Sequence, residues 1–194
     1  MSGNASVSAQ HDPSEKASVT VWISVACGML GAFMAVLNIQ ITNASLPQIE
    51  GGIGTGIDNG AWISTAYLIG EIIVIPLTDY LSRVFSFRLY LLVNTFLFLI
   101  FSAACAFASN LGQMIVLRGF QGFTGGVLIP MAFTLVVTRL PRSQQPIGMA
   151  LFAITATFAP AIGPTIGGWI TDNYGWEYIF HINLIPGTVM LIGL

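Results

Sequence analysis

The sequence predicts an all-α, polytopic membrane protein, and three observations support that prediction. Hydrophobic residues make up 55% of the 194 residues and charged residues only 7%, whereas a soluble chain has about 25% charged residues. The mean hydropathy is +0.81. The apolar residues also gather in stretches close to the roughly 20 residues that an α-helix needs to cross a bilayer.

Six apolar stretches are expected to be membrane helices that form one bundle over residues 19–194. The preceding residues 1–18 are polar and lack the basic start and apolar core of a cleaved signal peptide, so we expect a disordered cytoplasmic tail. The helices are expected at about 19–41, 61–82, 88–108, 112–138, 147–170 and 178–194.

Short polar connections separate these helices. In chain order they are 42–60, the stretch between Arg83 and Arg88, 109–111, the stretch with Arg139 and Arg142, and 171–177. The sixth helix reaches Leu194 through the apolar run LIPGTVMLIGL, with no charged or aromatic residue to close it. We therefore expect that helix to be incomplete and the chain to be an N-terminal half or fragment of a larger protein.

The basic residues indicate the orientation of the bundle. Lys16 precedes the first helix, and the arginines of the second and fourth connections share its side if the chain crosses the membrane each time. The other three connections contain acidic residues but no Lys or Arg. Because cytoplasmic loops carry the excess of basic residues, we expect a multi-pass protein of the plasma or inner membrane with a cytoplasmic N-terminus.

The run APAIGPTIGG in the fifth helix is the most informative motif. Pro160 and Pro164 each remove an intrahelical hydrogen bond. Gly163 and Gly167 leave a flat stripe where another helix can approach closely, and Gly168 extends the run. Small residues at this spacing can serve packing alone, but the ten-residue pattern resembles the antiporter motif of drug/proton antiporters in the major facilitator superfamily.

Further stretches from about Val36 to Pro186 resemble the fourteen-helix family of these antiporters. They are VLNIQITNASLPQI at the end of the first helix, WISTAYLIG in the second, VLRGFQGFTGG in the fourth and WEYIFHINLIPG before the sixth. The resemblance implies the six-helix N-terminal bundle of a major facilitator fold. It also implies export of hydrophobic or cationic small molecules in exchange for protons, with the proton gradient as the energy source and no cofactor.

Three residues are candidates for proton coupling. Glu71 lies about ten residues into the second helix, where burial favours the neutral form of a carboxyl group. Arg118 and Gln121 match the family's R-x-x-Q-G motif, and a buried arginine is costly without a partner. Two alternatives stay open: Arg118 could extend to the membrane interface, and Glu71 could be a permanently protonated packing residue.

Two departures limit what the resemblance implies. Asn38 stands at the acidic position of the first-helix signature, so Asn38, Gln40 and Asn43 are candidates for the substrate cavity or for helix packing. In the connection DYLSRVFSFR, Asp79 replaces a family glycine and Arg83 replaces the family acid. Asp79, Arg83 and Arg88 could form a cytoplasmic gate, or could anchor the helix ends at the interface.

Other residues carry weaker expectations. Trp62, Trp169 and Trp176 lie near proposed membrane boundaries and are expected to be interfacial anchors, while His181 is expected to be a packing residue. We expect no metal site and no nucleic-acid partner, because no ligand cluster or basic patch is visible. The absence of G-x-S-x-G and of a phosphate-binding glycine motif argues against an enzyme.

The expected partners are the lipid bilayer, the transported small molecules and a C-terminal transporter half. The sequence leaves open whether a periplasmic adaptor and an outer-membrane channel extend the export path. Two other functions also remain: a truncated membrane protein or assembly partner that does not transport, and a half-transporter that works as a homo-oligomer.

Overall fold

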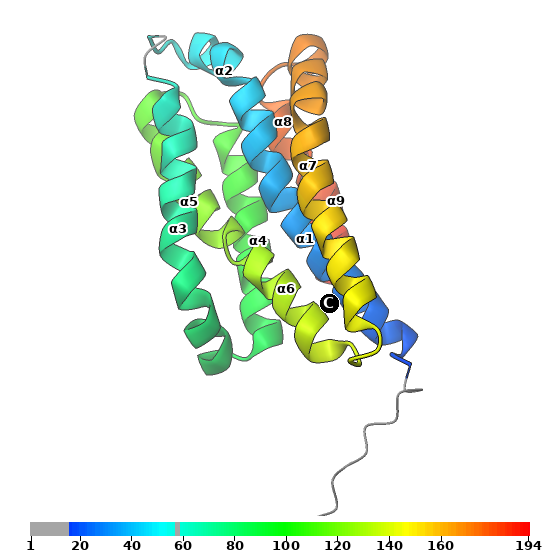
Figure 1. Ribbon diagram of the computed structural model, residues 1–194. Helices are drawn as coiled ribbons and strands as arrows, with labels where there is room; N and C mark the ends of the chain where they lie inside the picture. Colours follow the sequence, from blue (N-terminus) through cyan, green and yellow to red (C-terminus); the bar gives the residue numbers. More distant parts are fainter. Residues whose placement is uncertain (1–15, 57–58) are drawn as a thin grey trace, which may run out of the picture.

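The structure is a computed structural model that describes residues 16–56 and 59–194. Within these residues the secondary structure is helical, as Figure 1 shows. The helices are α1 Val19–Ala44, α2 Leu46–Ile53, α3 Ala61–Val84, α4 Phe87–Cys105, α5 Leu111–Gly125, α6 Leu128–Arg139, α7 Gln145–Tyr174, α8 Tyr178–His181 and α9 Leu184–Gly193. Residues 1–15 of the predicted tail lie outside the described residues.

The predicted all-α polytopic fold is confirmed. Among the described residues, α1, α3, α4, α7 and the combined segment Leu111–Arg139 are long and apolar enough to cross a membrane. The sixth apolar segment, Tyr178–Gly193, is shorter. In the bundle, α1 contacts α6, α7 and α9, while α5 contacts α3 and α4 (Figure 1). The segment from α5 to α6 therefore connects the two sides.

The segments expected at 112–138 and 178–194 are helical, and each is interrupted once in its hydrogen bonding, between α5 and α6 and between α8 and α9. The residues at these breaks keep right-handed helical backbone angles. Each break lies four residues before a proline, because Pro130 cannot donate to Gly126 and Pro186 cannot donate to Ile182. The expectation of a loop over 42–60 is wrong in part, since α2 lies within it.

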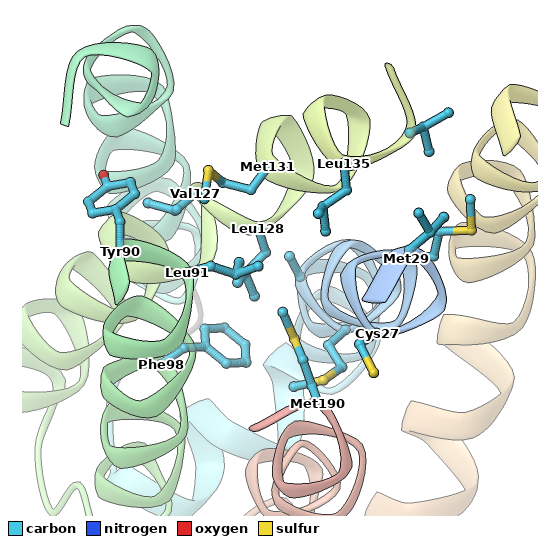
Figure 2. Close-up of a cluster of buried hydrophobic side chains, with 14 of the residues drawn as sticks. Cys27, Met29, Tyr90, Leu91, Phe98, Val127, Leu128, Met131, Leu135 and Met190 are labelled. Carbon is cyan, nitrogen blue, oxygen red and sulfur yellow. The ribbon is translucent and has the colours of Figure 1, made fainter. Parts of the chain in front are cut away.

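Two apolar clusters hold the bundle together. One lies where α1, α4, α6 and α9 meet, and Figure 2 shows its side chains pointing toward one another from these helices. Phe98, Leu128 and Met190 are buried at its centre. The other cluster joins α1 to α8 at the end of the bundle near α2, around Ile41, Ile49 and Phe180. The buried groups of the candidate site lie on the helices that these clusters hold together.

The connection between α3 and α4 contains a strained backbone. Ser86 has φ 66° and ψ 140°, and it is the only described residue other than glycine with a positive φ. Its hydroxyl accepts a hydrogen bond from the backbone N–H of Leu89 at 3.4 Å and so caps α4. The cap offsets part of a backbone conformation that favours glycine.

Replacing this residue with glycine should stabilise the bundle. Ser86→Gly relieves the strained φ and loses only a weak cap, so we expect the free energy of unfolding to rise by about 1 kcal/mol. Ser86→Ala is the control, since it loses the cap and keeps the strain, and it should lower that free energy by about 1 kcal/mol. SDS titration in mixed micelles measures both values. A glycine variant no more stable than the parent would show that the backbone is not strained there.

Candidate functional site

The candidate site is built around Arg118 of α5, which is only 1% exposed. Its Nη1 donates hydrogen bonds to Oδ1 of Asn38 on α1 and to Oε1 of Gln121, the latter at 2.7 Å. The guanidinium carbon lies 4.3 Å from the centre of the Tyr67 ring on α3. The alternative in which Arg118 extends to the membrane interface is therefore wrong, since the side chain stays inside the bundle.

Neutral groups surround this buried cation. The amide oxygens of Asn38 and Gln121 accept from it, and the face of Tyr67 attracts it electrostatically. The only ion pair among the described residues is the one between Asp79 and Arg83. The side-chain atoms Arg118 Nε and Gln121 Nε2 have no hydrogen-bond partner in the structure. The site therefore has unused donors and an uncompensated positive charge.

Glu71 lies on α3, one turn after Tyr67, and is 7% exposed. Its carboxyl group makes no hydrogen bond or ion pair with the described residues, and so none with Arg118. A Cβ atom added at Gly126 would lie 2.8 Å from the Cα of Glu71. Glu71 is therefore packed against the break between α5 and α6.

Glycines allow α3 to approach α5 closely enough to place Tyr67 over Arg118. A Cβ atom at Gly70 would collide with the backbone of Gly119 and lie 2.7 Å from the N atom of Phe123. A Cβ atom at Gly122 would collide with the carbonyl oxygen of Tyr67. The sequence interpretation missed this contact, although the small residues on both helices were a usable signal.

The three candidates for a substrate cavity do not lie together. Asn38 is 2% exposed and points to Arg118, so it serves the contact between α1 and α5. Asn43 accepts a hydrogen bond from the hydroxyl of Ser64 on α3. Gln40 lies against Gly163 of α7. Each of them therefore contacts a different helix.

The glycines of the motif in α7 face α1 of the same bundle. A Cβ atom at Gly163 would lie 2.5 Å from the Cβ of Gln40, and one at Gly167 would lie 2.9 Å from the carbonyl oxygen of Ile41. These two glycines of the motif therefore pack within this bundle. Pro160 is half-buried, Pro164 is exposed, and a Cβ atom at Gly168 would meet nothing within 4 Å.

The proposed gate residues are separated. Asp79 and Arg83 form an ion pair with an N···O distance of 2.9 Å, and both side chains are 78% exposed. Arg88 lies on α4 and lines a different hollow, together with Arg139 and Ser24. An exposed pair of this kind contributes little to stability.

Comparison with known proteins identifies the family. The profile of the Major Facilitator Superfamily matches residues 28–194. The chain belongs to the Major Facilitator Superfamily. It is thus a multi-pass membrane protein of a transporter family, as the sequence motifs indicated.

Its relatives in this superfamily include exporters and resistance proteins. The colistin resistance protein EmrB of Acinetobacter baumannii is 40% identical over 171 residues, which cover 88% of this chain and 33% of that protein. The multidrug export protein EmrB of Escherichia coli K12 is 36% identical over 184 residues, or 94% of this chain and 35% of that protein. The fatty acid resistance protein FarB of Neisseria gonorrhoeae is 34% identical over 178 residues, with shares of 91% and 35%. The chain spans about a third of the length of these relatives.

The contact between α1 and α7 can be tested with two neighbouring glycines. Gly167→Ala forces a methyl group against the backbone of Ile41, so the free energy of unfolding should fall by about 1–3 kcal/mol. Gly168→Ala is the matched control, because its methyl group meets open space and alanine favours the helix by up to about 1 kcal/mol. Equal effects of the two changes in SDS titration would contradict the close contact.

Proposed function

We propose that this chain is the N-terminal bundle of a proton-coupled drug exporter. Transporters of this fold work by rocking two helix bundles around a site near the midplane of the membrane. The family and its drug-export relatives support the proposal. The observation that carries it is the Arg118 guanidinium, which is buried among neutral groups and lies over the ring of Tyr67, one helical turn before Glu71 on α3.

In this proposal Glu71 binds and releases the transported proton. Glu71 is buried, with an exposed fraction of 7%, so the proposal requires the rocking of the two bundles to open a path from water to its carboxyl group. Arg118 favours the ionised carboxyl group electrostatically, and Gln121 and Asn38 hold the guanidinium in place. Glu71 packs against Gly126, at the break between α5 and α6. A change in the charge of Glu71 therefore acts on the point where the hydrogen bonding of the fourth membrane segment is interrupted.

The remaining candidate residues have supporting roles. Gly163 and Gly167 fix α7 to α1, which leaves Pro164 and Gly168 to face a second bundle. Asn43 and Gln40 lie at contacts between α1 and its neighbours, and a substrate could reach them from the side that the second bundle covers. Asp79, Arg83 and Arg88 act at the cytoplasmic end, as a gate or as interface anchors.

In this proposal the protein lies in the inner or plasma membrane, and its N-terminus is in the cytoplasm. The arginines of the connections after α3 and α6 lie at the same end of the bundle as the start of α1 (Figure 1). The opposite end carries α2 and α8, with acidic residues and no Lys or Arg in its connections. This distribution supports a cytoplasmic N-terminus.

The experiment is efflux of a fluorescent cationic dye from cells that express the chain alone or extended through its downstream coding sequence. We expect efflux from the extended form only, and a protonophore should abolish it. Arg118→Ala should reduce efflux to background. Glu71→Gln should remove its response to an imposed pH gradient, whereas Glu177→Gln, in a connection, should not.

Three outcomes would overturn parts of the proposal. Efflux by the short chain would indicate a homo-oligomeric half-transporter. A Glu71→Gln protein that still follows the pH gradient would exclude Glu71 as the proton site. An extended form that reaches the membrane at normal levels and moves no dye would exclude drug export of this substrate class, and the short chain would then be an assembly partner or a truncated protein.

A further inference from the structure

The motif WEYIFHINLIPG places a second aromatic ring on the buried cation. Its residue Phe180 lies on α8 and has an exposed fraction of 0%. The guanidinium carbon of Arg118 lies over this ring, 5.8 Å from its centre. A cation within about 6 Å of an aromatic ring centre is attracted by the negative face of the ring. Phe180 is thus an aromatic partner of Arg118 in addition to Tyr67.

Two buried polar side chains fix the backbone of Phe180 to α4. The hydroxyl of Ser102 on α4 donates a hydrogen bond to the carbonyl oxygen of Phe180 at 2.7 Å, and the side-chain amide of Asn183 donates to that hydroxyl at 2.9 Å. Ser102 and Asn183 are 0% and 1% exposed, so both bonds lie inside the bundle. Carbonyl groups near a helix end lack an intrahelical donor, and buried ones need another. Phe180, Asn183 and Pro186 are three residues apart and supply the ring, its fixation and the helix break.

Helix α4 reaches the same site a second time, one turn after Ser102. The thiol of Cys105 donates to Oε1 of Gln121 at 3.6 Å, and this oxygen also accepts from Nη1 of Arg118. Cys105 is 0% exposed. Two groups that contact Arg118 therefore depend on α4, Phe180 through Ser102 and Gln121 through Cys105.

Phe180 also packs against an aromatic neighbour that has no charge. Trp176 lies edge-on to it, with ring centres 6.3 Å apart, and a Cβ atom added at Gly52 of α2 would collide with the indole nitrogen. Trp176 is half-buried in this contact, which corrects its expected role as an interfacial anchor. Packing of this kind needs the shape of the Phe180 ring, whereas the contact with Arg118 also needs the negative charge on the face of that ring.

From these contacts we propose that Phe180 is a positioning residue of the proton-coupling site, fixed by Ser102 and Asn183 so that its ring holds the Arg118 guanidinium in place. The role in coupling rests on the function proposed above, whereas the contact between ring and cation does not. Phe180 acts through Arg118, which favours the ionised carboxyl group of Glu71. A less negative ring face therefore holds Arg118 less firmly and weakens the coupling.

The test replaces Phe180 with phenylalanines that carry one or three fluorine atoms, which keep the apolar ring and withdraw electrons from its face. In SDS titration of this chain, the equilibrium constant for folding should fall stepwise, by about three- to tenfold for the trifluorinated ring. The steps should disappear in an Arg118→Met background. Trifluorophenylalanine at Phe98, which is equally buried, is the control for the volume of fluorine. Equal constants across the series, or steps that persist without Arg118, would overturn the proposal.

The same series in the form extended through the downstream coding sequence tests the role in coupling. At matched membrane levels, protonophore-sensitive efflux of the cationic dye should fall in the order of fluorination, by roughly threefold for the trifluorinated ring. Unchanged efflux beside a graded folding constant would overturn the role in coupling. An unsubstituted extended form that moves no dye would overturn the exporter and this role together, while the folding series would still decide whether Phe180 holds Arg118.

A further variant tests how the ring is fixed. Ser102→Ala removes the donor to the Phe180 carbonyl and the acceptor of the Asn183 amide, so the folding steps on fluorination should shrink by about half or more. Ser24→Ala is the control, because the Ser24 hydroxyl bonds only to the Thr20 carbonyl of its own helix, at 3.1 Å. Steps of equal size in both backgrounds would overturn the role of Ser102.

Discussion

The guanidinium of Arg118 lies inside a membrane bundle, where a charge at the centre of a helix costs about 2.5–3.5 kcal/mol even on a lenient scale. Three helices share in reducing that cost. The Asn38 amide comes from α1, the Tyr67 ring from α3 and the Gln121 amide from α5 itself. The relative positions of α1, α3 and α5 therefore depend on this one cation. If any of the three helices shifts, the Arg118 guanidinium loses one of its stabilising contacts.

Close helix contacts make this arrangement possible, and they have a functional consequence. Glycines at 70 and 122 bring α3 against α5, so that the hydroxyl of Tyr67 also reaches the carbonyl oxygen of Ala35 on α1, at 3.4 Å. Glu71 follows on the next turn, beside the break before α6. In the proposed exporter, a proton that binds Glu71 would change the charge one helical turn from Tyr67, the ring that contacts Arg118. That coupling is the physical basis of the exporter proposed above.

Sequence patterns predicted the class of fold and the family, because the hydropathy pattern and the motif around Gly163 each extend over many consecutive residues. They did not predict the breaks that precede Pro130 and Pro186, since Pro160 and Pro164 leave α7 continuous and a proline alone does not decide where a helix is interrupted. Nor did they predict the partners of Arg118. Its contacts with Asn38 and Tyr67 depend on how glycines let three helices approach one another, which no single segment encodes.

The coupling free energy between Arg118 and Asn38 tests this account most directly. A double-mutant cycle with Arg118→Met and Asn38→Leu, followed by SDS titration, isolates it from the effect of each side chain alone. Because the two groups share one buried hydrogen bond, we predict a coupling of about 1–3 kcal/mol. Additivity within about 0.5 kcal/mol would contradict the account, since Arg118 would then not depend on α1 for its place in the bundle.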